Sequence, residues 1–141
     1  MKIEHINPTG LLKPKGYTHV ITVEGGKTAY IAGQGAYDTN WNLVGEGDHY
    51  DQGKQSFTNL IMALEGVGAT LESIVKCTIY VVGPNADTLT AVTNGMGNAA
   101  GKRIPPTAST MVGMERLAFD GMLVEIDAVA VVCQCPERSR T

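Results

Sequence analysis

Two alternating patterns of hydrophobic and polar residues divide the chain into short elements. Residues Thr18–Val23 and Lys27–Ala32 are rich in β-branched and aromatic side chains and lie on either side of Gly25 and Gly26. A Gly-Gly pair suits a two-residue hairpin turn because both positions can adopt a positive φ. The pattern therefore predicts a β-hairpin, and KIEHI at residues 2–6 is expected to add a short strand before it.

Two segments have the periodicity of helices. After Asp48, four apolar residues three or four positions apart share one face: Phe57, Leu60, Ile61 and Leu64. Asp48 is a suitable N-cap, and Gly66 or Gly68 is expected to end this helix. A second helix is predicted after Asn85, with an apolar stripe of Leu89, Val92 and Met96. Two glycines near its end weaken the second pattern.

Three later segments alternate with the period of a strand. One face of the segment at residues 74–82 carries Val75, Cys77, Ile79 and Val81. Residues 107–117 and 122–132 follow, joined by a short connection, and they are expected to form a second hairpin. The glycine-rich stretch GQGAY at residues 33–37 lacks the context of a dinucleotide-binding turn and is interpreted as a loop.

The order of elements is hairpin, helix, strand, helix, hairpin. This order predicts an α+β domain in which both helices cover one face of a mixed sheet. The other face carries apolar and aromatic side chains that neither helix would cover. Such a face usually meets another subunit, so we expect a homo-oligomer.

Composition restricts the class of protein. The chain has 141 residues, 43% of them hydrophobic, which fits one domain at residues 1–133 followed by a polar tail at residues 134–141. The net charge of −3 and the lack of a basic cluster longer than GKR at residues 101–103 disfavour nucleic acid as a partner. No run approaches the ~18 apolar residues of a membrane span, so we expect a cytoplasmic protein with no membrane partner.

The three cysteines point to neither a disulfide framework nor a metal site. Cys77 lies in an apolar strand pattern and is expected to be a buried structural thiol. Cys133 and Cys135 form a CQC motif, but without a nearby His or second Cys pair they supply less than half of a zinc site. We therefore expect no metal and no cofactor.

Two features of the last third of the chain carry candidate chemistry. Glu125 and Asp127 share a strand face about 7 Å apart, where they either reach solvent at a sheet end or serve as a general acid or base. In RIPPTASTMV, at residues 103–112, two prolines forbid a helix and set the direction of the strand that follows. That strand either simply ends a loop or presents its hydroxyl residues to a site.

Four stretches together extend these interpretations: YIAGQGA, GVGATLESIVKCTIYVV, PPTASTMVGMERL and LVEIDAVAV. In order and spacing, from Pro14 to Val132, they resemble the Rid family, the reactive-intermediate deaminases also called YjgF proteins. The resemblance implies a chorismate-mutase-like α+β fold and a homotrimer around a central barrel, with ligand clefts between adjacent subunits. The best-known members hydrolyse a small enamine or imine to a 2-oxo acid and ammonia, without metal or covalent nucleophile.

The resemblance also assigns roles to residues. The last-strand glutamate that handles the attacking water falls on Glu125, and Tyr17 matches a tyrosine that lines the cleft. Gly33 and Gln34 match the turn beside the cleft. His19 stands where familiar members have a different polar residue, and it would bind an anion or act as a second base if it faced the cleft.

One position departs from the family pattern. Ser109 stands where the family has an arginine that grips the substrate carboxylate, and Thr110 follows it, so these two hydroxyls are the expected substrate-binding groups. A neutral hydrogen bond in place of a charged pair weakens anchoring by about 1–2 kcal/mol. Arg103 lies six residues away, about 20 Å of extended chain, so we expect it not to take that place within one subunit. A neighbouring subunit's Arg103 or Lys102 is the alternative.

Three functions stay open. The first is deamination of an enamine or imine unlike the smallest family substrates, including a 2-aminomuconate-type compound from aromatic degradation. The second is a non-catalytic ligand-binding or chaperone-like trimer. RNA cleavage, which has been attached to family members, is the third and is disfavoured by the net negative charge.

Overall fold

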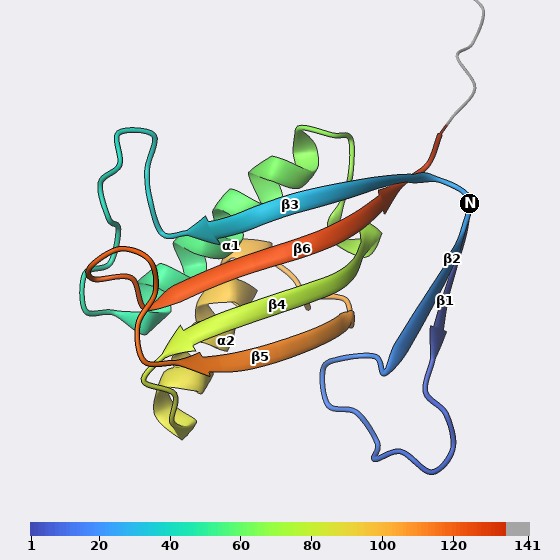
Figure 1. Ribbon diagram of the computed structural model, residues 1–141, viewed down its shortest axis with the longest axis horizontal. Helices are drawn as coiled ribbons and strands as arrows, with labels where there is room; N and C mark the ends of the chain where they lie inside the picture. Colours follow the sequence, from blue (N-terminus) through green and yellow to red (C-terminus); the bar gives the residue numbers. More distant parts are fainter. Residues whose placement is uncertain (135–141) are drawn as a thin grey trace, which may run out of the picture.

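A computed structural model describes residues 1–134 as a mixed four-stranded sheet with two helices on one face and a separate two-stranded ribbon (Figure 1). The elements in chain order are β1 (Lys2–Ile6), β2 (Val20–Glu24), β3 (Lys27–Gly35), α1 (His49–Glu65), the 3-10 turn η1 (Leu71–Ser73), β4 (Ile74–Val82), α2 (Ala86–Ala100), β5 (Ala108–Met114) and β6 (Val124–Val132). The strand order in the sheet is β3-β6-β4-β5, with only the β4–β5 pair parallel. The predicted α+β layering is confirmed.

The core lies between this sheet and the helices. The predicted helical face is buried at Phe57, Leu60 and Leu64, and it packs on inward-facing residues of β4 and β6 such as Val81 and Ile126. Each fully buried side chain of this size contributes about 1.5–3 kcal/mol to folding.

Both helices begin and end where their sequences indicate. The Asp48 carboxylate accepts a hydrogen bond from the Asp51 amide at 3.0 Å, and Gly66 is the C-cap of α1. Asn85 caps α2, which runs through its two glycines to Gly101, in the left-handed conformation. A Cβ on Gly95 would overlap the Tyr50 carbonyl oxygen of α1, so this glycine allows the two helix backbones to approach closely.

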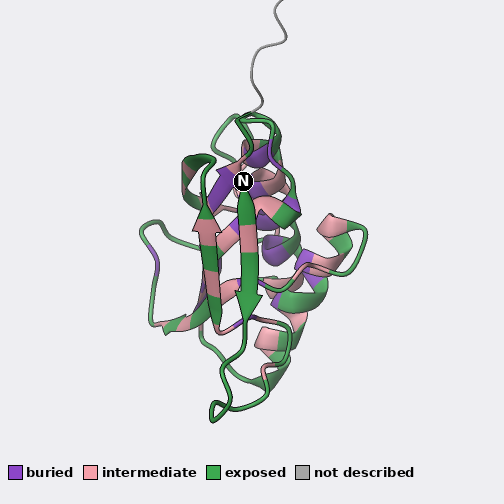
Figure 2. Ribbon diagram, turned by 90° about the vertical axis from the view of Figure 1, so that its right-hand side faces the viewer, coloured by how far each residue is buried: buried purple, intermediate pink, exposed green. Residues whose placement is uncertain are grey.

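Neither predicted hairpin forms. Gly25 and Gly26 adopt positive φ values of 74° and 83°, but β2 pairs with β1 and leaves the sheet, whereas β3 pairs with β6. The turn residues permit a hairpin without fixing the partner of each strand. Figure 2 shows that β1 and β2 have no buried residue on either face.

The second hairpin fails because β6 is the central strand. It inserts between β3 and β4, and β5 pairs in parallel with β4 instead, in the register Cys77 with Ser109. Two strands that follow one another in the sequence are therefore separated by β4. A parallel β4–β5 pair requires a crossover, and α2 supplies it.

The sheet face opposite the helices is not covered by the described chain. Tyr30 on β3 is 83% exposed, and Thr78 and Tyr80 on β4 are partly exposed. Among the helices of residues 1–134, none has the length and apolar character to cross a membrane.

Candidate functional site

Glu125 lies on β6 beside a bulge in β3; it pairs with Gly35, and the bulge itself faces Asp127. Ile31 pairs with Ala128 and Gln34 with Ile126, so two residues of β3 face one residue of β6. One of these two is Gly33, and a Cβ there would overlap the Glu125 carboxylate and lie 2.8 Å from its Cδ. Gly33–Gly35 thus ends a strand, which corrects the loop interpretation. The bulge and the missing side chain together make room for the carboxylate.

A cavity of about 310 Å³ brings Glu125 together with Gly33 and Gln34. The Gln34 side-chain amide donates to the Ala32 carbonyl at 3.0 Å, which fixes its orientation along the bulge. Within residues 1–134, no side chain forms a hydrogen bond or ion pair with the half-buried Glu125 carboxylate. Three of the predicted site residues therefore meet at one place, and the acid among them is available to a ligand.

The second acid of this face has a different environment. The Tyr80 hydroxyl donates to Asp127 Oδ2 at 3.3 Å, and Tyr80 stands opposite Glu125 in the register of β4 and β6. The Asp127 charge raises the pKa of the Tyr80 phenol, because ionising the phenol would place two negative charges side by side. Asp127 thus has a partner that Glu125 lacks.

Three aromatic rings complete the cavity of Glu125. Tyr37 follows β3, Trp41 lies in the next loop, and Phe119 precedes β6. The ring centroids of Trp41 lie 5.7 Å from Tyr37 and 5.8 Å from Phe119, and those of Tyr37 and Phe119 are 6.3 Å apart. Trp41 is 73% exposed and Phe119 55% exposed.

Asp38 holds the loop that carries Trp41. Its Oδ1 accepts from the backbone amides of Asn40 at 2.8 Å and Asn42 at 2.9 Å, and its Oδ2 accepts from the Asn42 side chain at 3.1 Å. These hydrogen bonds lower the pKa of Asp38, and the one from the Asn42 backbone amide has the largest effect. Asn40 and Asn42 directly precede and follow Trp41, whose φ of 64° lies in the left-handed region that bulky residues rarely adopt.

A larger cavity, about 550 Å³, lies between α2 and the β5 edge of the sheet. Tyr17 and Ser109 line it, with Cys77 and other core residues at its base. Burial, with a smaller effect of the Asp127 charge, raises the pKa of the Cys77 thiol to about 12. The predicted inert, buried thiol is confirmed.

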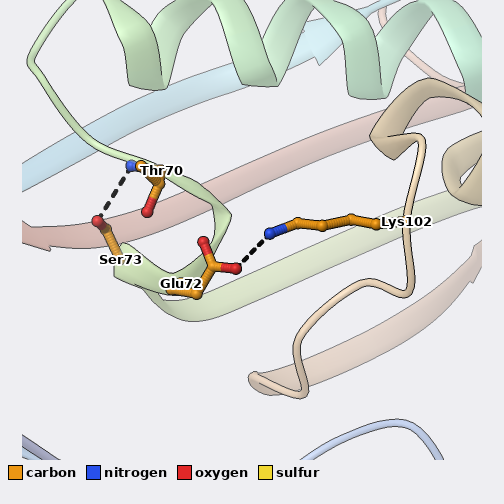
Figure 3. Close-up of polar contacts among 4 residues, drawn as sticks. All are labelled: Thr70, Glu72, Ser73 and Lys102. Carbon is orange, nitrogen blue, oxygen red and sulfur yellow. Dashed lines mark hydrogen bonds and ion pairs between the residues drawn. The ribbon is translucent and has the colours of Figure 1, made fainter.

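Cationic side chains line the same cavity. Lys15, Lys102 and Arg103 all contribute, and Figure 3 shows Lys102 paired with Glu72 beside η1. Arg103 and Ser109 line the same cavity within one subunit, while the expectation that Arg103 does not take the place of the family's arginine there stays a prediction.

The two hydroxyls of RIPPTASTMV are separated. Ser109 lies on the helix side of β5, whereas Thr110 lies on the opposite face and accepts a hydrogen bond from Lys76 Nζ at 3.1 Å. The buried Thr107 fixes the start of the strand, because its carbonyl accepts from the Thr18 amide at 2.9 Å. Only Ser109 of the predicted pair lines a cavity, since adjacent residues of a strand point to opposite faces.

The structure ties His19 to the chain beside Tyr17. Its Nε2 lies 2.7 Å from the Leu12 carbonyl, so Nε2 carries the proton and donates it. The ring contacts Tyr17 edge-on at 5.3 Å and lines neither cavity. Within one subunit, His19 therefore packs against Tyr17 and lies outside both cavities, and its role as a base or an anion ligand stays a prediction.

The predicted site residues thus fall into two groups within one subunit. Glu125 lies beside the β3 edge of the sheet, and Tyr17 and Ser109 lie at the β5 edge, on the helix side. The three aromatic residues of the Glu125 cavity, which are Tyr37, Trp41 and Phe119, were not identified from the sequence. The signal was present in YDTNWN, because an Asp followed by two Asn residues is typical of a side-chain-capped turn.

No cluster of metal-ligating side chains occurs in the part of the chain that the structure describes. Cys133 is exposed, while residues 135–141 of the predicted polar tail, which include Cys135, lie outside the described residues.

Comparison with known proteins gives a consistent family. The family described as Endoribonuclease L-PSP matches residues 11–132. A RutC family protein of Synechocystis sp. is 36% identical over 104 residues, which cover 73% of this chain and 77% of that protein. A protein of Dermatophagoides farinae named 2-iminobutanoate/2-iminopropanoate deaminase is 28% identical over 110 residues, 78% of this chain and 82% of that protein.

Solved structures agree. A Rid family protein from Yersinia pestis has a TM-score of 0.82 and 32% identity, and the match covers 94% of this chain and all of that one. A YjgF/YER057c/UK114 family member from Mycobacterium tuberculosis has a TM-score of 0.58 and 28% identity, covering 83% of this chain and 87% of that one. These matches confirm the predicted chorismate-mutase-like fold.

Proposed function

Because the chain belongs to the Rid/YjgF family, we propose that it hydrolyses a reactive imine or enamine to an oxo compound and ammonia, with Glu125 as the acid–base group. The observation that carries this proposal is the Glu125 carboxylate, which stands at a cavity wall in space left by Gly33. The deaminase name of the Dermatophagoides relative supports the reaction class.

The chemistry asks little of the protein. Glu125 accepts a proton from water as the water oxygen bonds to the imine carbon, and it passes this proton to the nitrogen to give a tetrahedral amino alcohol. As the C–N bond breaks, the hydroxyl proton passes through Glu125 to the nitrogen, so the carbonyl forms, ammonia leaves and the carboxylate is restored. Each turnover consumes one imine and one water and yields one oxo compound and one ammonia. Orientation of the substrate and one proton-transfer group suffice for such a step.

The active site is proposed to lie between two subunits of a homotrimer. Glu125 and Tyr17 line separate cavities near opposite edges of the sheet, so one chain alone does not bring them to one ligand. Docking the β5 edge of one subunit against the β3 side of the next would join the two groups. The uncovered sheet face, with Tyr30 exposed, supplies surface for that contact.

Arg103 and Lys15 are proposed to replace the family's carboxylate clamp. Both line the cavity of Ser109, whereas Lys102 there is already paired with Glu72. The Ser109 hydroxyl would add a neutral hydrogen bond. The cationic side chains of this cavity, together with the apolar core residues at its base, suit a substrate larger than the smallest imino acids. A 2-aminomuconate-type compound is therefore kept as the alternative substrate.

The test is ammonia release from a panel of imines and enamines generated enzymatically from amino acids. Wild-type protein should accelerate release for at least one member of the panel, and Glu125→Gln should lose at least 90% of that acceleration while it keeps the wild-type oligomeric state. Full activity in Glu125→Gln would remove Glu125 from the mechanism. No acceleration on any member would favour the non-catalytic ligand-binding or chaperone-like trimer.

RNA cleavage is the activity that the family description names. The net charge of −3 and the carboxylates of Asp38 and Glu125 in the smaller cavity oppose binding of a phosphate backbone. Single-stranded RNA incubated with the wild-type protein should therefore stay uncleaved.

A further inference from the structure

The cavity of Glu125 combines aromatic rings with negative charge. Tyr37, Trp41 and Phe119 line it together with Asp38 and Glu125, and no Lys, Arg or His of the described chain belongs to its lining. Aromatic ring faces and carboxylates both attract cations, and they give an anion no partner. The charge of this cavity is therefore opposite to that of the larger cavity at Ser109.

Two of the three rings are open to a ligand. Phe119 contacts Trp41 and Tyr37 edge to face, at interplanar angles of 83° and 88°, whereas Tyr37 and Trp41 are tilted by 54°. Trp41 and Phe119 are both mainly exposed, which leaves ring surface available to a ligand. A flat group can lie against such a face while it carries its charge toward the carboxylates.

Trp41 is held in place by its surroundings. Its left-handed backbone conformation is costly for a bulky residue, and the hydrogen bonds that Asp38 accepts from Asn40 and Asn42 close the loop around it. A strained and exposed aromatic residue in a braced loop beside a free carboxylate indicates a binding role.

We propose that this aromatic cavity binds a planar organic cation, such as the protonated form of an imine, between the Trp41 and Phe119 rings and the Glu125 carboxylate. Only the identity of the natural ligand rests on the proposed deaminase function. In that setting the cavity selects the protonated, more electrophilic form of the imine and holds it beside the acid–base group. The substrate's own anionic group would then lie in the cationic Ser109 cavity of the neighbouring subunit.

Three isosteric probes of different charge test the proposal: benzamidinium, benzamide and benzoate. Trp41 is the only tryptophan of the chain, so its indole N–H gives one NMR signal that reports binding at this place. Benzamidinium should shift this signal and bind about fivefold more tightly than benzamide, the difference expected for a cation on an exposed aromatic site. Benzoate should bind most weakly.

Variants separate the two sources of attraction. Trp41→Gly removes the ring and suits the positive φ, and calorimetry should then find a smaller preference for benzamidinium over benzamide. Glu125→Gln should reduce the preference while the indole signal still responds. Leu12→Ala, which removes an exposed apolar side chain outside the cavity, should bind all three probes like the wild type. If Trp41→Gly does not fold, Phe119→Ala replaces it.

Equal affinity for the three probes, tightest binding of benzoate, or a preference that is undiminished in Trp41→Gly would overturn the proposal. So would an indole signal that moves on dilution of the protein but not with benzamidinium, because a second copy of the chain would then cover the ring. Binding is measured without turnover. Failure here with intact, Glu125-dependent ammonia release would leave the deaminase proposal standing, and the reverse result would leave the cation site standing.

Discussion

Gly33 has no side chain because the Glu125 carboxylate fills the space where its Cβ would lie. Gly33→Ala should therefore displace that carboxylate or destabilise the protein by about 1–3 kcal/mol, as overpacking does. Chemical denaturation measures the loss, and ammonia release should fall at least tenfold as the acid–base group moves.

A double-mutant cycle isolates the contact between these two residues. Glu125→Ala removes the overlap, so it should restore most of the stability that Gly33→Ala costs. Strictly additive effects of the two substitutions would show that Gly33 is needed for another reason.

The contact between α1 and α2 depends on Gly95. Gly95→Ala would press a methyl group into the Tyr50 carbonyl and should lower the free energy of unfolding by about 2 kcal/mol or more, because backbone has to move. Gly97 lies two residues on in the same helix, and a Cβ there meets nothing within 4 Å. Gly97→Ala should be neutral or stabilise by up to about 1 kcal/mol. Equal effects of the two substitutions in thermal unfolding would contradict the packing argument.

The buried Cys77 thiol makes stability fall in alkali. The folded protein keeps the thiol protonated up to a pKa of about 12, while the unfolded chain loses the proton near its ordinary pKa of about 8.5. The unfolded state therefore binds fewer protons between these values, and stability should decrease as the pH rises through that window. Cys77→Ala should flatten this part of the stability profile. It should also leave unchanged the number of thiols that react rapidly with a disulfide reagent in the native protein at pH 8.

Periodicity and caps predicted the local structure, but strand pairing needed the whole fold. Asp48 and Asn85 mark both helix starts, because a cap is a contact between near neighbours in the sequence. The Gly25–Gly26 turn and the link into β6 suggested hairpins, yet β6 pairs with strands far away in the sequence. A turn signal is local, whereas the partner of a strand depends on which residues the whole core buries.

Part of the candidate site could likewise be predicted from the sequence, and part depended on the fold. Glu125, Gly33 and Gln34 could be grouped from the family pattern, and they line one cavity. The separation of Ser109 from Thr110 follows from strand alternation and was available from the sequence. The approach of Arg103 to the cavity of Ser109 was not, because it depends on the path of the chain after Gly101.

The most direct test of a site shared between subunits mixes two inactive variants. Glu125→Gln and Tyr17→Ala should each release ammonia at a tenth of the wild-type rate or less. The two variants are unfolded together in equal amounts and refolded as a mixture, and each variant refolded alone is the control. In a cyclic trimer a random mixture gives about one interface in four with both native residues, so release should recover to about a quarter of the wild-type rate. A mixture no more active than its parents would contradict a site built from two subunits.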